Sequence, residues 1–337
     1  MVARLYNRDG WINWPYIMDQ GAVFNMVVGA RGTGKTYGLM KELITRGEPF
    51  IYLRRLKTQM DVCSKVTGNP FKRLNLDNGW NILPFSVGGN IEFRKDEKEG
   101  QLIAVGLALS TVATIRGIDF SGFNYIVFDE AIAMTGEKPI KSEFDCFMNF
   151  YETVNRNREL IGEKPVQAFL LGNANKLANP YFSGWRFMKT SLKMLRGGQM
   201  VYRTPDGTRL MVMLQNSPIS RKKLSTAVYQ NGSQDFISMA IDNSFRTDET
   251  KIKSEPLKEY SHIVSIGEIG IYRHKSERRY YVSSKTSLPY YDDFGIQLKM
   301  FRNDYFVLRS CYLVAKNILF EDYESELLFR EYFDLNR

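Results

Sequence analysis

A glycine-rich segment between an apolar run and a helical pattern constrains the fold of this chain more than any other feature. Residues 23–28 form the apolar run, which is typical of a short strand, and residues 29–36 follow directly with the pattern G-x-x-x-x-G-K-T. Apolar residues then recur at helical spacing as far as Gly47, where a helix C-cap is expected. The sequence therefore predicts a strand, a glycine loop and a helix in that order.

This arrangement is suited to holding phosphate groups. Backbone N–H groups of such a loop converge on phosphate oxygens, and the N-terminus of the following helix adds its positive dipole. Lys35 is placed to reach the β- and γ-phosphates, and the hydroxyl of Thr36 to bind Mg²⁺. The alternative, a chance glycine turn, leaves the Lys-Thr pair unexplained. We therefore predict that ATP and Mg²⁺ bind through Gly29, Ala30, Arg31, Gly32, Thr33, Gly34, Lys35 and Thr36.

Two acids end a later apolar run. Residues 125–128 read as a buried parallel strand, and Asp129 and Glu130 follow at its carboxyl end. Phosphoryl transfer needs an acid that anchors the metal and a group that positions the attacking water. We assign the first role to Asp129, through water, and the role of general base to Glu130. Solvated strand-end acids are the alternative interpretation.

The next apolar run, residues 166–171, stops close to Asn173. Its side-chain amide could touch the γ-phosphate or the attacking water and so take part in hydrolysis. It could equally be a turn-forming asparagine, given its Gly172 neighbour. Both interpretations stay open from the sequence.

Strand and helix patterns alternate over about 190 residues, which predicts an α/β fold with a parallel sheet. Further strands are expected at 50–53, 91–94 and 101–109, and a helix capped by Ser142. A turn at 204–207 predicts a β-hairpin, followed by a polar linker. The expected division is a P-loop ATPase domain over 1–197, a hairpin and linker over 198–235, and a C-terminal domain over 236–337. In the last, we expect a hairpin-like pair, 263–272 with 280–283, and a helix over 308–319.

Composition excludes several function classes. Hydrophobic residues make up 44% of the 337 residues and charged residues 25%, as in an ordinary globular protein with two domains. Both histidines lie in the last quarter, which argues against a Ser-His-Asp triad with the N-terminal half. The three widely spaced cysteines fit neither a disulfide framework nor a zinc site. The chain lacks a long apolar run or a signal-peptide pattern, so we expect an intracellular protein without membrane contact.

The charge balance is basic. Lys+Arg 46 against Asp+Glu 37 gives 46 − 37 = +9. This favours a polyanionic partner such as nucleic acid. Many soluble proteins are equally basic for no specific reason, so charge alone leaves both interpretations open.

Five segments together resemble the DNA-packaging ATPases of phi29-like tailed phages. They cover roughly the first 190 residues and occur in this order: 29–36, 50–55, 126–130, 153–159 and 179–182. The resemblance implies a RecA-like core of the additional-strand, catalytic-glutamate class, with a smaller α+β C-terminal domain, RNase H-like and a vestigial nuclease. It also implies a homomeric ring, usually a pentamer, which drives double-stranded DNA through the portal of a procapsid. Such a ring works in the bacterial host cytoplasm, at the portal vertex, and its isolated subunits can be monomeric.

In such a ring a neighbour completes each site. The resemblance places a trans-acting arginine finger at Arg156 and a second basic trans residue at Arg116, with Arg158 as the competitor for the finger. Ordinary surface basic residues are the alternative for all three. Candidate DNA-backbone contacts follow the strand after the first helix, and a solvated strand end is the alternative there. These are Arg54, Arg55 and Lys57.

The C-terminal third matches the family in length and position. Its acids are scattered without the spacing of a metal pair, which argues against cleavage of DNA. The resemblance implies docking onto a packaging RNA, for which the basic stretch 273–279 is a candidate. Two alternatives remain: a terminase with an active C-terminal nuclease, and a non-motor, nucleotide-gated assembly protein. Glu130 beside Asp129 argues against the second. The scattered acids are Glu268, Asp292, Asp293 and Glu321.

Overall fold

The computed structural model divides the chain into two compact units. One unit holds residues 1–175 and 194–245, and the other holds residues 176–193 and 246–337. The structure describes residues 5–87, 90–114, 119–134, 137–173, 177, 179–215, 217–219, 226–230 and 252–335.

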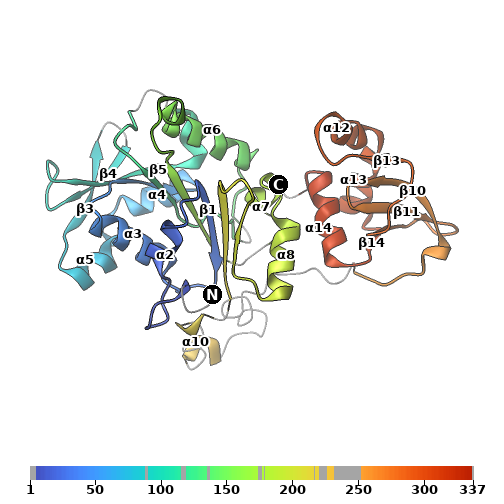
Figure 1. The fold of residues 1–337 in the computed structure, drawn as a ribbon, viewed down its shortest axis with the longest axis horizontal. Helices are drawn as coiled ribbons and strands as arrows, with labels where there is room; N and C mark the ends of the chain where they lie inside the picture. Colours follow the sequence, from blue (N-terminus) through green and yellow to red (C-terminus); the bar gives the residue numbers. More distant parts are fainter. Residues whose placement is uncertain are drawn as a thin grey trace. The chain divides into compact units, whose positions relative to one another are not determined.

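A large sheet forms the centre of the first unit (Figure 1). It has nine strands in the order β3-β4-β5-β2-β6-β7-β1-β9-β8. Its six central strands, from β5 to β9, run parallel, and antiparallel strands extend both ends. This confirms the α/β class. The strands are β1 (Phe24–Gly29), β2 (Phe50–Arg54), β3 (Ile82–Val87), β4 (Asn90–Lys95), β5 (Leu102–Ala108), β6 (Tyr125–Phe128), β7 (Gln167–Asn173), β8 (Val201–Arg203) and β9 (Arg209–Leu214).

The strand order places β7 between β1 and β6. Strand β1 leads into the glycine loop, β6 leads into Asp129, and β7 pairs with both. An extra strand between these two is the feature that the additional-strand class predicts.

Helices cover both faces of this sheet. On one face, Tyr52 and Val127 share a core with residues of α3 (Lys35–Thr45) and of the N-terminal segment. On the other face, Phe128 stacks on Phe147 of α6 (Glu143–Asn155), with ring centroids 5.8 Å apart. Successive residues of a strand point to opposite faces, so apolar runs such as 125–128 can fill both cores. The remaining described helices of this unit are α2 (Trp14–Met18), α4 (Lys57–Cys63), α5 (Lys72–Asn78) and α10 (Ala227–Gln230).

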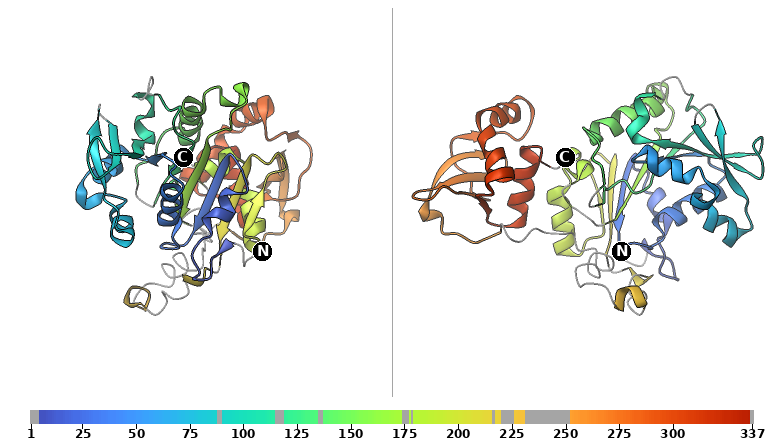
Figure 2. Two further views of the ribbon diagram at one scale, coloured as in Figure 1. Left: turned by 60° about the vertical axis from the view of Figure 1, so that its left-hand side comes forward. Right: turned by 180° about the vertical axis from the view of Figure 1, so that it is seen from behind.

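The hairpin predicted around 204–207 is present, but it belongs to the large sheet instead of a separate linker. Strand β9 pairs in parallel with β1, and β8 forms the sheet edge. In Figure 2 the yellow β9 lies beside the blue β1, although paired residues such as Phe24 and Arg209 are 209 − 24 = 185 positions apart in the chain. The expected boundary at 198 therefore does not follow the packing.

The structure also departs from the expected first domain, 1–197, in a second way. Residues 176–193, which include α7 (Pro180–Gly184) and the start of α8 (Met188–Gly197), group with the C-terminal residues. Arg186 forms an ion pair with Asp293, and Lys189 one with Glu268. These pairs hold residues expected in the first domain within the smaller unit.

The second unit contains a five-stranded mixed sheet in the order β13-β10-β11-β12-β14. Buried apolar residues of its strands and helices form the main core, and Tyr260, Tyr272 and Tyr281 form a smaller cluster. No described helix of either unit is long and apolar enough to cross a membrane. The elements are β10 (Tyr260–Ile266), β11 (Ile269–His274), β12 (Tyr280–Ser283), β13 (Tyr290–Tyr291), α12 (Gly295–Asp304), α13 (Phe306–Ser310), β14 (Ile318–Phe320) and α14 (Tyr323–Tyr332).

Two local predictions for this unit are wrong. Residues 263–272 are not one strand, because Gly267 turns the chain with a φ of 51° and separates β10 from β11. The predicted helix over 308–319 ends at Lys316, whose φ is 50°, and Leu319 lies in β14. Both turns use left-handed backbone, which reverses or ends an element within one or two residues.

The N-terminal segment buttresses the first helix, and this contact can be tested. A Cβ at Gly38 would lie 2.6 Å from Cδ1 of the buried Trp14 ring. We expect Gly38→Ala to lower the free energy of unfolding by about 1–3 kcal/mol through overpacking, which outweighs the roughly 1 kcal/mol of better helix propensity. Chemical denaturation measures the effect. Gly197→Ala, a helical glycine with open space around it, is the matched control, and equal stability of the two variants would contradict the contact.

Candidate nucleotide-binding site

A cavity of about 400 Å³ lies at the carboxyl ends of β1, β6 and β7. Parallel strands bring their carboxyl ends to one edge, and helix N-termini point there, which is where α/β sheets bind ligands. The lining residues come from the glycine loop, from the acid pair and from the end of β7. They are Arg31, Gly32, Gly34, Lys35, Thr36, Tyr37, Asp129, Glu130, Met134, Leu171, Gly172 and Asn173.

The glycine loop has the backbone that its sequence predicts. Gly34 has a φ of 86°, which favours glycine, and α3 begins at the next residue. The buried Thr33 donates its hydroxyl hydrogen to the carbonyl of Ala30 at 3.1 Å. Nε1 of Trp14 donates to the carbonyl of Gly34 at 3.4 Å, and the ring of Trp11 packs against the same glycine. The loop is therefore held from inside and from the N-terminal segment.

Lys35 is buried at the first position of α3. Its Nζ donates to the carbonyls of Gly29 and Ala30 at 2.9 and 2.7 Å, and to Oδ1 of Asn173 at 3.2 Å. A buried ammonium needs such acceptors. Asn173 thus lies within reach of the lysine that is expected to bind phosphate, as one of its two interpretations requires.

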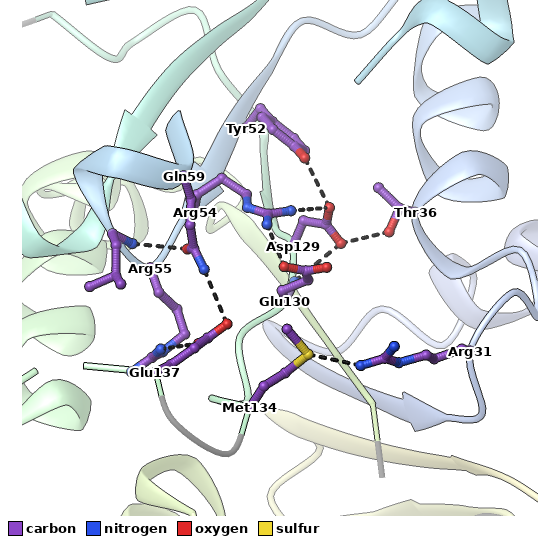
Figure 3. Close-up of polar contacts among 11 residues, drawn as sticks. Arg31, Thr36, Tyr52, Arg54, Arg55, Gln59, Asp129, Glu130, Met134 and Glu137 are labelled. Carbon is purple, nitrogen blue, oxygen red and sulfur yellow. Dashed lines mark hydrogen bonds and ion pairs between the residues drawn. The ribbon is translucent and has the colours of Figure 1, made fainter. Parts of the chain in front are cut away.

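Thr36 and Asp129 meet across the site. The Thr36 hydroxyl donates to Oδ1 of Asp129 at 2.6 Å, and the Tyr52 hydroxyl donates to Oδ2 at 2.9 Å (Figure 3). Burial, with the nearby Asp129 charge, raises the pKa of Tyr52 well above its usual value, so its hydroxyl remains a donor. Asp129 is thereby fixed with one oxygen turned toward the glycine loop.

These oxygens suit a hard cation. A threonine hydroxyl and one carboxylate fit Mg²⁺, which keeps several waters and takes its other ligands from substrate phosphates. Among the described residues no group of three or more His, Cys, Asp or Glu could hold a metal ion by itself. The pair Thr36–Asp129 therefore matches a nucleotide-dependent Mg²⁺ site.

Arg54 occupies the centre of the acid pair, where Figure 3 shows it between both carboxylates. Its Nη1 lies 2.9 Å from Oδ2 of Asp129, and its Nη2 binds the carboxylate of Glu130. Glu130 has a φ of 53°, an uncommon conformation outside glycine that costs about 1–3 kcal/mol and clusters at functional sites. The expectation that Arg54 contacts DNA is not met here, since its guanidinium faces the acids.

Arg55 and Lys57 have different environments. Arg55 is fully buried, and its guanidinium binds Glu143 and Glu137, so it does not face solvent as a DNA contact requires. Lys57, at the start of α4, is 63% exposed and forms an exposed ion pair with Asp61 at 3.2 Å. Such a pair contributes little. Lys57 therefore remains a candidate for contact with a phosphate backbone.

The two candidates for the arginine finger, Arg156 and Arg158, differ in burial. Arg158 is buried, and its guanidinium donates to the carbonyls of Ser121 and Phe123 and to Oδ1 of Asn124 at 2.8–3.0 Å. Arg156, at the C-cap of α6, has a side chain that is 55% exposed, 4.0 Å from Asp119. The exposed arginine is the one that can reach a neighbouring molecule. Arg116 lies outside the described residues.

Arg156 lies at the edge of the sheet opposite the cavity. Helix α6 begins beside the carboxyl end of β6, where Phe147 stacks on Phe128. Farther along, Tyr151 packs on Phe24, the first residue of β1. The seven residues of β7 span about 23 Å between these edges, which is longer than an arginine side chain. Arg156 therefore does not reach the cavity of its own chain.

The acids of the C-terminal unit are engaged with neighbouring groups. Asp293 and Glu268 pair with Arg186 and Lys189, as described above. Glu321 accepts hydrogen bonds from the hydroxyls of Ser283 and Ser284 at 2.7 and 2.9 Å. These contacts give each of the three acids a partner within the unit.

Comparison with known proteins agrees with this geometry. Residues 7–310 match the family model described as podovirus DNA encapsidation protein (Gp16). The chain belongs to this family. The DNA packaging protein of Bacillus phage B103 is 31% identical over 171 residues, which are 49% of each chain. The chain thus spans about half the length of the curated relatives it matches.

Solved structures extend the similarity of fold across the chain. The Phi-28 gp11 DNA packaging motor aligns with a TM-score of 0.61 at 19% identity, covering 97% of this chain and 98% of the other. The bacteriophage Phi-29 viral genome packaging motor assembly aligns with a TM-score of 0.60, also at 19% identity, covering 97% and 99%. At this identity the likeness concerns the fold, and it includes the C-terminal unit of this encapsidation family member.

Two residues that contact the site, Tyr52 and Trp14, are not among the site residues predicted from the sequence. Tyr52 lies within an apolar strand, and the signal for it is its hydroxyl, which needs a partner when the ring is buried. Trp14 donates a hydrogen bond to Gly34, which lies 20 residues later in the chain, and the sequence contains no local signal for that contact.

The two arginines after α6 provide a matched pair for mutagenesis. We expect Arg158→Ala to lower the free energy of unfolding by about 1.5–3 kcal/mol, because buried acceptors lose a charged donor. Arg156→Ala should stay within about 0.5 kcal/mol of the wild type, as exposed substitutions do. Thermal and urea unfolding of both variants check this, and equal losses would contradict the assignment of Arg158 to structure and Arg156 to the surface.

Proposed function

We propose that this chain is an ATP-hydrolysing subunit of a ring motor that drives double-stranded viral DNA into a procapsid. One observation carries the proposal: Lys35, Thr36, Asp129 and Glu130 converge on one cavity at the carboxyl edge of a parallel sheet. Family membership supports the DNA-packaging context. The reaction is ATP + H₂O to ADP + phosphate.

The residues divide the chemistry among them. The backbone of the glycine loop and Nζ of Lys35 hold the β- and γ-phosphates, and Asn173 orients that lysine or the attacking water. Thr36 and Asp129 would hold Mg²⁺, which when bound offsets the phosphate charge. Glu130 accepts the proton of the attacking water. Because Arg54 pairs with Glu130, that carboxylate must give up this ion pair before it can act as a base.

A neighbouring subunit supplies the remaining positive charge. An arginine finger is worth about 10³ to 10⁵ in rate, and Arg156 is exposed at the edge away from its own cavity. We therefore assign Arg156 to the site of the adjacent subunit, with Arg116 as a second basic residue there. Delivery in trans couples hydrolysis to the geometry of a ring, for which five subunits are proposed.

The proposed partners follow from this role. They are double-stranded DNA, the portal of the procapsid and a packaging RNA, which the basic stretch 273–279 of the C-terminal unit would contact. The motor would act in the bacterial host, at the portal vertex. A ring that assembles on a portal template explains why isolated subunits can remain monomeric.

Steady-state ATP hydrolysis tests the proposal. We expect wild-type turnover to rise with double-stranded DNA and with protein concentration, while Arg156→Ala stays flat because shared sites need the finger. Glu130→Gln should keep nucleotide affinity and lose at least 10²-fold in turnover, since it removes the base. Turnover that ignores DNA, concentration and both substitutions refutes the motor and favours a nucleotide-gated binding module.

Lys57 gives a separate test of the DNA contact. We expect Lys57→Ala to reduce DNA-stimulated turnover and to lower the slope of log affinity against log salt by about one, because one phosphate contact is lost. The measurement is DNA affinity across a salt series, with basal turnover as reference. Lys98→Ala, an exposed lysine before β5, is the control. An unchanged salt slope excludes Lys57 from the interface.

A further inference from the structure

The adjacent arginines at the end of β2 bind two different parts of the first unit. Arg54 binds the carboxylates of Asp129 and Glu130. Arg55 binds Glu143, the first residue of α6, through two parallel contacts of 2.8 Å, from Nε to Oε1 and from Nη2 to Oε2. Arg54 is the last residue of β2 and Arg55 lies in the bend that follows, so one short segment joins the catalytic acids to the start of α6.

The contact between Arg55 and Glu143 is buried. Its side chain is 1% exposed and that of Glu143 is 4% exposed. Nη1 of Arg55 also binds Oε2 of Glu137 at 2.6 Å, and Glu137 in turn accepts a hydrogen bond from Gln59 of α4 at 3.3 Å (Figure 3). Apolar residues of similar volume often give equal or greater stability than a buried ion pair, whereas a two-point arginine fork fixes geometry.

Helix α6 also contacts β6, the strand that leads into Asp129. Phe147 stacks on Phe128, the residue before Asp129, with an interplanar angle of 22°. The 13 residues of α6 contain neither Gly nor Pro, the usual causes of a kink, and span about 20 Å. A displacement at its first turn is therefore carried to its far end, where Arg156 forms the C-cap.

We propose that the Arg55–Glu143 ion pair is a positioning contact that links the state of a subunit's own catalytic acids, through α6, to the Arg156 that it presents to its neighbour. When Arg54 leaves Glu130, Arg55 shifts with the same backbone and α6 follows. The inference rests on the proposed trans role of Arg156. It adds that Glu143 acts on the neighbour's hydrolysis more than on that of its own subunit.

Mixed motors on procapsids separate these two sites. Subunits with Glu130→Gln are silent at their own site and donate Arg156, while subunits with Arg156→Ala keep a competent site and accept the finger. The mixture is expected to be active although each variant alone is not. Glu143→Gln is then added to the donor or to the acceptor, because it keeps shape and an acceptor oxygen but loses the charge. Glu152→Gln, the same change at an exposed position of α6, is the control.

Glu143→Gln in the donor should lower turnover of the mixture by roughly 10- to 100-fold, since a misplacement of about 1 Å costs this much. In the acceptor it should change turnover by less than about twofold. Equal losses in both positions, a loss confined to the acceptor, or no loss at all would overturn the proposal. An inactive starting mixture refutes the trans role of Arg156 and the inference with it. Thermal unfolding and nucleotide affinity are measured for every variant. Glu143→Asp keeps the charge, so in the donor it should lower the turnover of the mixture less than Glu143→Gln does.

Discussion

The parallel pairing of β1, β7 and β6 is the constraint on which the site depends. Its register sets Gly29 opposite Asn173 and Phe128 opposite Leu170, so β1 and β7 end together and β6 ends three residues earlier at the same edge. Lys35 then reaches Asn173, and Thr36 reaches Asp129, without any long loop. A slip of one residue would turn every buried side chain to the other face. The apolar runs therefore fix the position of the polar groups that follow them.

The sequence predicts those parts of the site that depend on local pattern. The glycine loop, the strand before it, the helix after it and the acids after 125–128 are each contiguous, so a local pattern is enough to predict them. Whether each arginine is buried or exposed depends on residues far away in the sequence. Arg54, Arg55 and Arg158 all lie at or just after the end of a strand or helix, and nothing in their immediate neighbourhood separates a buried residue from a solvated one. The partner Glu143, 88 residues after Arg55, decides its burial.

The C-terminal unit is less predictable for a different reason. Its strands are two to seven residues long. A sequence window long enough to show hydrophobic periodicity therefore covers two elements and mixes their patterns. The apolar positions between 263 and 272 are compatible with a single strand because β10 and β11 share a core, and a tight turn at Gly267 leaves little polar sequence between them. A left-handed residue such as Lys316 has no reliable signature when it is not glycine.

The positions of the two functional ends also bear on assembly. The cavity lies at the carboxyl edge of the sheet and Arg156 at the amino edge, so on the proposed mechanism one chain holds two unlike halves of an active site and completes neither alone. Contacts between unlike surfaces repeat from subunit to subunit and close into a ring when the rotation permits. In such a ring every subunit is both donor and acceptor. A rigid α6 that joins the two edges would then make the state of one site a condition for hydrolysis at the next, which gives sequential firing a structural basis within a single helix.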